Sequence, residues 1–163
     1  MIQRTEECLA GTAGNCLITA WTGGMNVESV RMADAVAQEL EERYPQGILM
    51  LVILASVTLL DADQKQLAGA FYAKHGPHLR GVANVVLGTG FWAGAVRAVL
   101  IALRVFSPMP YPMSTFSSTS SALRWLERHG SKQPLRGPEV DRIMREVSAL
   151  LGDSLSLRPE SNL

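Results

Sequence analysis

The sequence has few of the residues on which several classes of function depend. Two cysteines and three histidines are too few for a cysteine-rich metal site or a disulfide-stapled scaffold. Charged residues make up only 18% of the 163 residues, and fifteen Lys and Arg balance fifteen Asp and Glu. The lack of net positive charge argues against nucleic-acid binding, which needs a cationic surface to displace counterions.

Long apolar segments are also lacking. The two most apolar segments are 48–55 and 92–106, and the second contains Arg97 and Arg104. A helix that crosses a membrane needs about 20 apolar residues. No charged region followed by a long apolar run opens the chain, so no secretory signal is expected. We expect a cytoplasmic protein with two buried thiols, and a cross-strand disulfide is the alternative.

Strand-like and helix-like segments alternate along the chain. Residues 5–10 and 15–21 are predicted to pair as a hairpin across the glycine-containing turn 11–14. The other strands are predicted at 48–55, 82–87 and 113–116. Helices are predicted after a cap at Asn26, from 61 to 75, from 92 to 106, and from 121 to 129 after a cap at Thr119 or Ser120.

This alternation predicts an α/β fold with a mixed, largely parallel sheet of four to five strands and flanking helices. The uninterrupted apolar run 48–55 is typical of a central strand covered on both faces. We expect residues 1–130 to form this domain and 131–137 to form a linker. Apolar residues at helical spacing predict an amphipathic C-terminal helix over 138–152, followed by a flexible tail, 153–163.

Candidate sites for small ligands are weak. Gly88, Thr89 and Gly90 join a strand to a helix, where backbone N–H groups can bind phosphate, but the glycine spacing of a dinucleotide site is not met. His75 and His78 are separated by a Gly-Pro pair, so they are predicted to mark a helix end rather than to bind zinc. We expect no metal, no cofactor and no catalytic group.

The helix predicted over 92–106 is the most unusual element, because apolar residues cover nearly all of its surface. A second surface is therefore expected to cover it: the C-terminal helix, a second subunit or a membrane surface. The expected oligomer contact, in which a dimer is favoured, consists of Trp92, Leu100, Leu103, Ile143, Met144 and Val147.

Two segments carry a resemblance to a known family. Val57, Thr58, Leu60 and Asp61 stand in a strand-to-helix segment that is similar to the central motif of STAS domains, the anti-anti-sigma factor family. Phe116, Ala122, Trp125 and Leu126 form an ending that resembles the SpoIIAA-like (STAS/SEC14-related) branch. The resemblance covers about residues 2–130 and includes the order of the strands and helices.

The sequence departs from this family at its regulatory position. The phosphoacceptor serine of the family falls on Ala62, which has no hydroxyl, and Asp61 and Asp63 flank it. The first aspartate of the motif falls on Ile53, and its glycine falls on Gln64. Phosphorylation at the usual position is therefore excluded.

The resemblance implies a non-catalytic module that docks another protein through the start of a helix. The docking residues predicted on this basis are Ser56, Thr58, Asp61, Ala62 and Asp63. The alternative hypothesis is a small-ligand binding protein that takes a lipid or a nucleotide.

Overall fold

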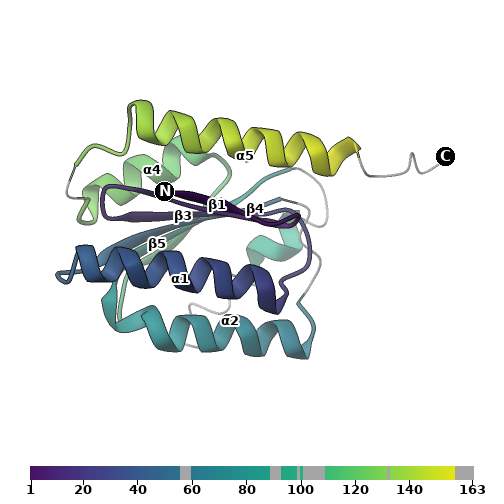
Figure 1. Ribbon diagram of the computed structural model, residues 1–163, viewed down its shortest axis with the longest axis horizontal. Coiled ribbons are helices and arrows are strands. Elements are labelled where there is room, and N and C mark those ends of the chain that lie inside the picture. The colour runs from purple at the N-terminus through teal and green to yellow at the C-terminus, as the bar shows by residue number, and fades with distance from the viewer. Residues whose placement is uncertain (56–59, 89–92, 99, 101–108, 132, 157–163) are drawn as a thin grey trace.

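The computed structural model describes residues 1–55, 60–88, 93–98, 100, 109–131 and 133–156. Its six-stranded sheet carries helices on both faces (Figure 1). The strands are β1 (Ile2–Arg4), β2 (Cys8–Ala13), β3 (Cys16–Trp21), β4 (Ile48–Leu54), β5 (Leu79–Val86) and β6 (Met113–Phe116). The helices are α1 (Val27–Arg43), α2 (Ala62–His75), the short 3₁₀ helix η1 (Gly76–His78), α4 (Thr119–Arg128) and α5 (Pro138–Ser156). Residues 93–98 are also helical.

The strands lie in the sheet in the order in which they occur in the chain. β1 and β2 pair antiparallel, as do β2 and β3, whereas β3 to β6 are parallel neighbours. The predicted α/β class and mixed sheet are confirmed. The sheet has six strands rather than four to five, because β1 is only three residues long and too short to show a period in the sequence.

The hairpin turn lies later in the chain than predicted. β2 and β3 pair up to Ala13 and Cys16, and Gly14 makes the turn with a φ of +55°. Residues 11–13, predicted to be part of the turn, belong to β2. Gly11 has a different purpose: a Cβ atom there would lie 3.3 Å from Cδ1 of Ile143, so the glycine lets α5 approach the sheet.

β4 lies near the middle of the sheet and is buried on both faces, as its apolar run predicts. Leu49, Leu51 and Ile53 point into a core shared with α4 and α5. Met50 and Val52 point into a second core, shared with α1 and the end of α2. Figure 1 shows these two helical layers on opposite sides of the sheet.

Helix boundaries follow the local capping chemistry. Asn26 caps α1, as predicted, and its side chain accepts a hydrogen bond from the backbone N–H of Ser29 at 2.8 Å. α4 is capped by Ser118 instead of Thr119 or Ser120. α5 begins at Pro138 as predicted but continues to Ser156, so residues 153–156 of the expected tail are helical.

The two cysteines are free thiols on opposite faces of the sheet. Cys8 lies in the core under α1, and Cys16 lies in the core under α4 and α5. Both are fully buried, and burial raises the pKa of each thiol to about 12. The predicted buried thiols are confirmed, and the alternative of a cross-strand disulfide is wrong.

Within the described residues, no helix combines the length and the apolar character needed to cross a membrane.

Candidate functional site

The start of α2 is exposed and carries three of the five predicted docking residues. Asp61 caps this helix in a reciprocal pair: its carboxylate accepts from the backbone N–H of Gln64 at 2.8 Å, and the Gln64 side chain accepts from the backbone N–H of Asp61 at 3.0 Å. Asp61, Ala62 and Asp63 are all exposed, and we call these three residues the docking end of α2. Ser56 and Thr58 lie outside the described residues.

A second helix start lies beside the docking end. A Cβ atom on Gly24, in the loop before α1, would lie 3.0 Å from Nε2 of Gln64. In the same loop Asn26 donates to the carboxylate of Glu7 at 2.9 Å. Glu7 and the docking end therefore lie at the same edge of the sheet, where its parallel strands end and where ligands commonly bind in α/β folds.

The glycine turn after β5 is only partly described. Gly88 is exposed and has a φ of +94°, and Thr89 and Gly90 lie outside the described residues. Arg97 donates to the carbonyl oxygens of Val86 and Gly88, at 3.0 and 3.3 Å. The described part of this turn thus presents carbonyl acceptors to a cation, whereas a phosphate would need N–H donors.

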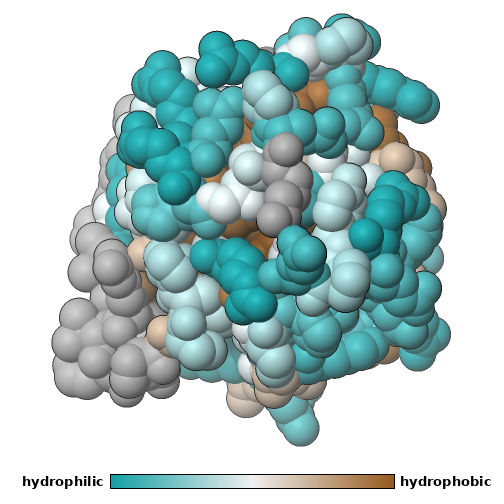
Figure 2. Space-filling model, turned by 90° about the vertical axis from the view of Figure 1, so that its left-hand side faces the viewer, coloured by the Kyte–Doolittle hydropathy of each residue, from teal (hydrophilic) through white to brown (hydrophobic). Residues whose placement is uncertain are grey.

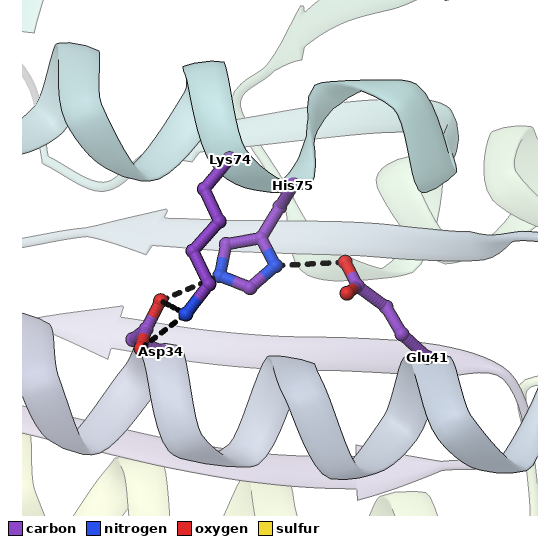
Figure 3. Close-up of polar contacts among 4 residues, drawn as sticks. All are labelled: Asp34, Glu41, Lys74 and His75. Carbon is purple, nitrogen blue, oxygen red and sulfur yellow. Dashed lines mark hydrogen bonds and ion pairs between the residues drawn. The ribbon is translucent and has the colours of Figure 1, made fainter.

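A buried polar cluster joins α1 to α2 and was not predicted from the sequence (Figure 3). The His75 side chain is fully buried; its Nδ1 lies 2.7 Å from Oε1 of Glu41, and its Nε2 lies 2.8 Å from Oδ1 of Asp34. Lys74 donates to both carboxylate oxygens of Asp34 at 2.8 Å. We call these four residues the His75 clamp.

The charges of the clamp act on Asp34 in two directions. Partial burial raises the pKa of Asp34, but hydrogen bonds from Lys74 and His75 and the positive charges of these groups lower it by more. The net result is an Asp34 pKa below its ordinary value, which keeps the carboxylate ionised beside its two donors.

The geometry of the clamp suits a structural contact between α1 and α2 and does not suit acid–base catalysis by His75. Both ring nitrogens of His75 are occupied, and the ring has no exposed surface on which a substrate could meet it. The carboxylates of Asp34 and Glu41 lie on opposite sides of the ring and do not converge on one point (Figure 3). In the described part of the chain, no group of three His, Cys, Asp or Glu side chains could hold a metal ion.

The sequence contained a signal for the clamp. Asp34 and Glu41 are seven residues apart, which places them on one face of α1, two turns apart. The sequence analysis gave these two carboxylates no role and interpreted His75 as marking a helix end. His75 does end α2, but it is buried, because the two carboxylates of α1 supply partners for both of its nitrogens.

The six residues of the predicted oligomer contact do not form one exposed surface within the part of the chain that the structure describes. Ile143 and Val147 are 1% and 4% exposed, because α5 packs them into the core of their own chain. They present no surface to a second copy, so assigning them to the oligomer contact was wrong. Met144 and Leu100 are half-buried. Trp92 and Leu103 lie outside the described residues.

Two buried side chains on the α1 face of the sheet each carry a polar atom with no hydrogen-bond partner among the described residues. Thr19 on β3 and Asn84 on β5 both pair laterally with Val52 on β4, so the three residues form one row. Thr19 and Asn84 are 0% and 2% exposed, and neither the Thr19 hydroxyl nor the Asn84 amide nitrogen has a hydrogen-bond partner within the part of the chain that the structure describes. Such groups are rare in folded proteins, because each loses its hydration without compensation.

The end of the molecule where α1 and α2 finish, on the left of Figure 1, has a mainly hydrophilic surface. Hydrophilic side chains cover most of this face, and apolar atoms show only between them (Figure 2). Arg43 and Glu39 form an exposed ion pair on α1 at 2.9 Å, and Arg80 donates to the backbone carbonyl of Gln46 at 3.0 Å. Exposed pairs of this kind contribute little to stability.

Comparison with solved structures identifies the fold of the chain. No protein-family model matches the chain, and no curated protein matches it. Among solved structures, the chain is similar to an uncharacterized protein of the DUF3478 family with a SpoIIAA-like fold from Shewanella loihica PV-4. The TM-score is 0.53 at 17% sequence identity, and the match covers 77% of this chain and 90% of that one. The chain therefore has a SpoIIAA-like fold, as its sequence resemblance predicted.

Proposed function

We propose that this SpoIIAA-like chain is a non-catalytic interaction module that acts in regulation or assembly in the bacterial cytoplasm, and that it binds another protein through the docking end of α2. The observation that carries the proposal is the exposed, rigidly capped start of α2, where Asp61 and Asp63 flank Ala62. The capping pair holds the backbone in one conformation, which lowers the entropy lost when a partner binds. The free, buried thiols are in keeping with a reducing compartment.

The chemistry of the docking end favours a partner that carries positive charge. Asp61, Asp63 and the nearby Glu7 are carboxylates, and Ala62 between the two aspartates cannot be phosphorylated. The negative charge of this surface is therefore permanent instead of being added by a kinase. Complementary charges of this kind raise association rates and select partners.

The experiment that tests the proposal changes the charge of the docking end without removing the cap that stabilises α2. Asp63→Lys reverses one exposed charge without removing the cap, whereas Asp61→Lys would also remove the capping carboxylate. Asp141→Lys is the matched control, because Asp141 is an exposed acidic residue in the first turn of α5, on the opposite face of the sheet. Wild type and both variants are used as baits with cross-linking and mass spectrometry.

We expect a protein that is captured by wild type and by Asp141→Lys and lost with Asp63→Lys. Circular dichroism and melting temperature check that all three baits are folded. A partner retained equally by both variants would rule out the docking end as its binding surface.

A homo-oligomer, with a dimer favoured, is part of the same proposal. Leu100 and Met144 are the half-buried apolar residues that remain of the expected contact within the described part of the chain. Light scattering behind size exclusion at several concentrations tests the association. A clean monomer at every concentration would reject it, and a dimer that persists in Met144→Lys would exclude Met144 from the contact.

The second candidate function is small-ligand binding, favoured by the unpartnered row of Thr19 and Asn84. Both side chains can donate a hydrogen bond, so a ligand that reached them would present acceptors such as carboxylate, phosphate or carbonyl oxygens. Native mass spectrometry of the purified full chain tests this candidate. An added mass that disappears in Asn84→Leu would support it, and a bare chain mass under gentle ionisation would reject co-purification of a ligand.

A further inference from the structure

We propose that the His75 clamp controls how firmly the docking end of α2 is held, and that the imidazole of His75 makes this control pH-dependent. The inference rests on the proposed function for the role of the docking end, but not for the behaviour of the clamp. It identifies a regulatory input for a chain in which Ala62 stands at the position of the phosphoacceptor serine of the family it resembles.

The first observation is the way in which α2 is attached. Of its fourteen residues, only Phe71 and His75 are buried, and both belong to the second half of the helix. Residues 62–70 are exposed or half-buried. Near the helix start, Gln64 approaches the loop at Gly24. The position of the docking end therefore depends on contacts made about two turns or more further along a stiff helix.

The second observation is the bonding of the imidazole. Carboxylates face both ring nitrogens of His75, from Glu41 at 2.7 Å and from Asp34 at 2.8 Å. Ionised carboxylates only accept hydrogen bonds, so both contacts are hydrogen bonds only when both ring nitrogens carry protons. A neutral ring carries one proton, and its second nitrogen then turns a lone pair toward a carboxylate.

The other groups around His75 do not reverse this effect. Lys74 stays bonded to Asp34, and the Phe71 ring lies with its centroid 4.5 Å from that of His75. The phenols of Tyr72 and Tyr111 have pKa values raised by burial, so they remain neutral while histidine titrates. His78 on η1 is exposed.

The direction of the effect follows from these contacts. Histidine is the side chain that changes charge between about pH 5 and 8. When the ring loses its second proton, the imidazole loses one of its two hydrogen bonds and α2 is held less firmly. A carboxylate that takes up a proton no longer serves as an ionised acceptor for the ring. The docking end is therefore held most firmly while the ring carries both protons and the two carboxylates are ionised.

Amide hydrogen exchange on the full-length chain measures this without any partner. Exchange of α2 is compared with that of α5, on the other face of the sheet, after correction for the intrinsic pH dependence of exchange. In wild type we expect the protection of α2 relative to α5 to fall about tenfold as the pH rises from about 5 to 8, the size expected for one charge-assisted hydrogen bond.

Glu41→Gln is the decisive variant. The glutamine amide has nearly the same shape and can either accept from a ring N–H or donate to a bare ring nitrogen, so it suits both forms of the imidazole. We expect the pH dependence of α2 protection to become flat in Glu41→Gln. Glu39→Gln is the matched control, because it removes an exposed α1 carboxylate that pairs with Arg43 and does not touch the clamp.

A wild-type α2 whose relative protection does not change over this range would overturn the proposal, as would an unaltered pH dependence in Glu41→Gln. If Glu41→Gln does not fold, His75→Gln replaces it with the same expectation, since a glutamine at this position does not titrate. If the relative protection of α2 in wild type does not depend on pH while a partner is still captured through the docking end, the clamp is rejected as a regulator and the proposed function stands.

Discussion

His75 and Glu41 are 34 residues apart in the sequence, yet their side chains meet at 2.7 Å between Nδ1 and Oε1. The contact joins the last residue of α2 to the last turn of α1, and the histidine ring has no exposure to solvent. A buried polar group that loses its partner retains the cost of desolvation without the gain of the hydrogen bond.

Glu41→Ala should therefore destabilise the protein. The variant leaves Nδ1 of a buried imidazole without its partner, and we expect a loss of about 1–3 kcal/mol in the free energy of unfolding. Urea unfolding at neutral pH measures it. Glu39→Ala, which removes an exposed carboxylate two residues earlier, should change stability by less than about 0.5 kcal/mol. Equal losses in the two variants would show that the contact between His75 and Glu41 adds nothing to the free energy of unfolding beyond what an exposed carboxylate adds.

Asp34 should make stability depend on pH in the acid range. Its pKa is lower in the folded state than in the unfolded chain, where an aspartate titrates near about 3.9. This contribution is therefore fully present above the unfolded value and is lost as the pH falls through the folded value. Urea midpoints measured from about pH 6 to pH 3 should fall more steeply for wild type than for Asp34→Asn. Parallel curves would contradict the assignment.

Asp61 should stabilise α2 through its capping carboxylate. Asp61→Ala removes the acceptor for the Gln64 N–H and should cost about 0.5–2 kcal/mol, whereas Asp61→Asn keeps an acceptor oxygen and should cost less. Thermal and urea unfolding compare the two variants. A stability ranking with Asn below Ala would be incompatible with the cap.

Gly47 should not tolerate a side chain. Its φ is +127°, and a Cβ atom there would lie 2.5 Å from Cγ of Arg80. Gly47→Ala should destabilise by more than about 1 kcal/mol. Gly69, on the exposed side of α2, would have no atom within 4 Å of an added Cβ, so Gly69→Ala should instead stabilise by about 0.5–1 kcal/mol. The opposite signs of these two Gly-to-Ala changes provide the check.

Ile143 should be a core residue of the monomeric chain. It is 1% exposed and packs against Gly11, so Ile143→Ala should cost about 2–5 kcal/mol at any protein concentration. Ser148 lies on the exposed side of the same helix and bonds to the carbonyl of Met144, so Ser148→Ala should be nearly neutral. A loss of stability at Ile143 that varied with protein concentration would return this residue to an intermolecular contact.

The layout of the fold could be predicted because it depends on patterns within single segments. The uninterrupted apolar run of β4 indicated a strand buried on both faces, and α5 could be recognised from its spacing alone. The family motif also pointed to the start of α2. β1 was missed because three residues carry no period, and the turn was misplaced because Gly11 makes room for Ile143 instead of turning the chain.

The clamp could not be predicted in the same way, because it depends on how two helices pack against each other. The spacing of Asp34 and Glu41 shows that they share a face, but the same pattern occurs on helices that face water. Only the packing of α2 across α1 places His75 between them (Figure 3). The burial of Ile143 and Val147 was likewise a matter of which surface α5 covers, which periodicity does not specify.

The placement of Cys8 and Cys16 gives the chain a native chemical probe on each face of the sheet. Each thiol is sealed beneath a different helical layer, Cys8 under α1 and Cys16 under α4 and α5. A thiol-specific reagent can reach one of them only when the layer above it opens, and the reagent leaves a mass tag on the cysteine it has reached. Peptide mapping after brief labelling would thus show which side of the sheet comes apart first, without any engineered probe.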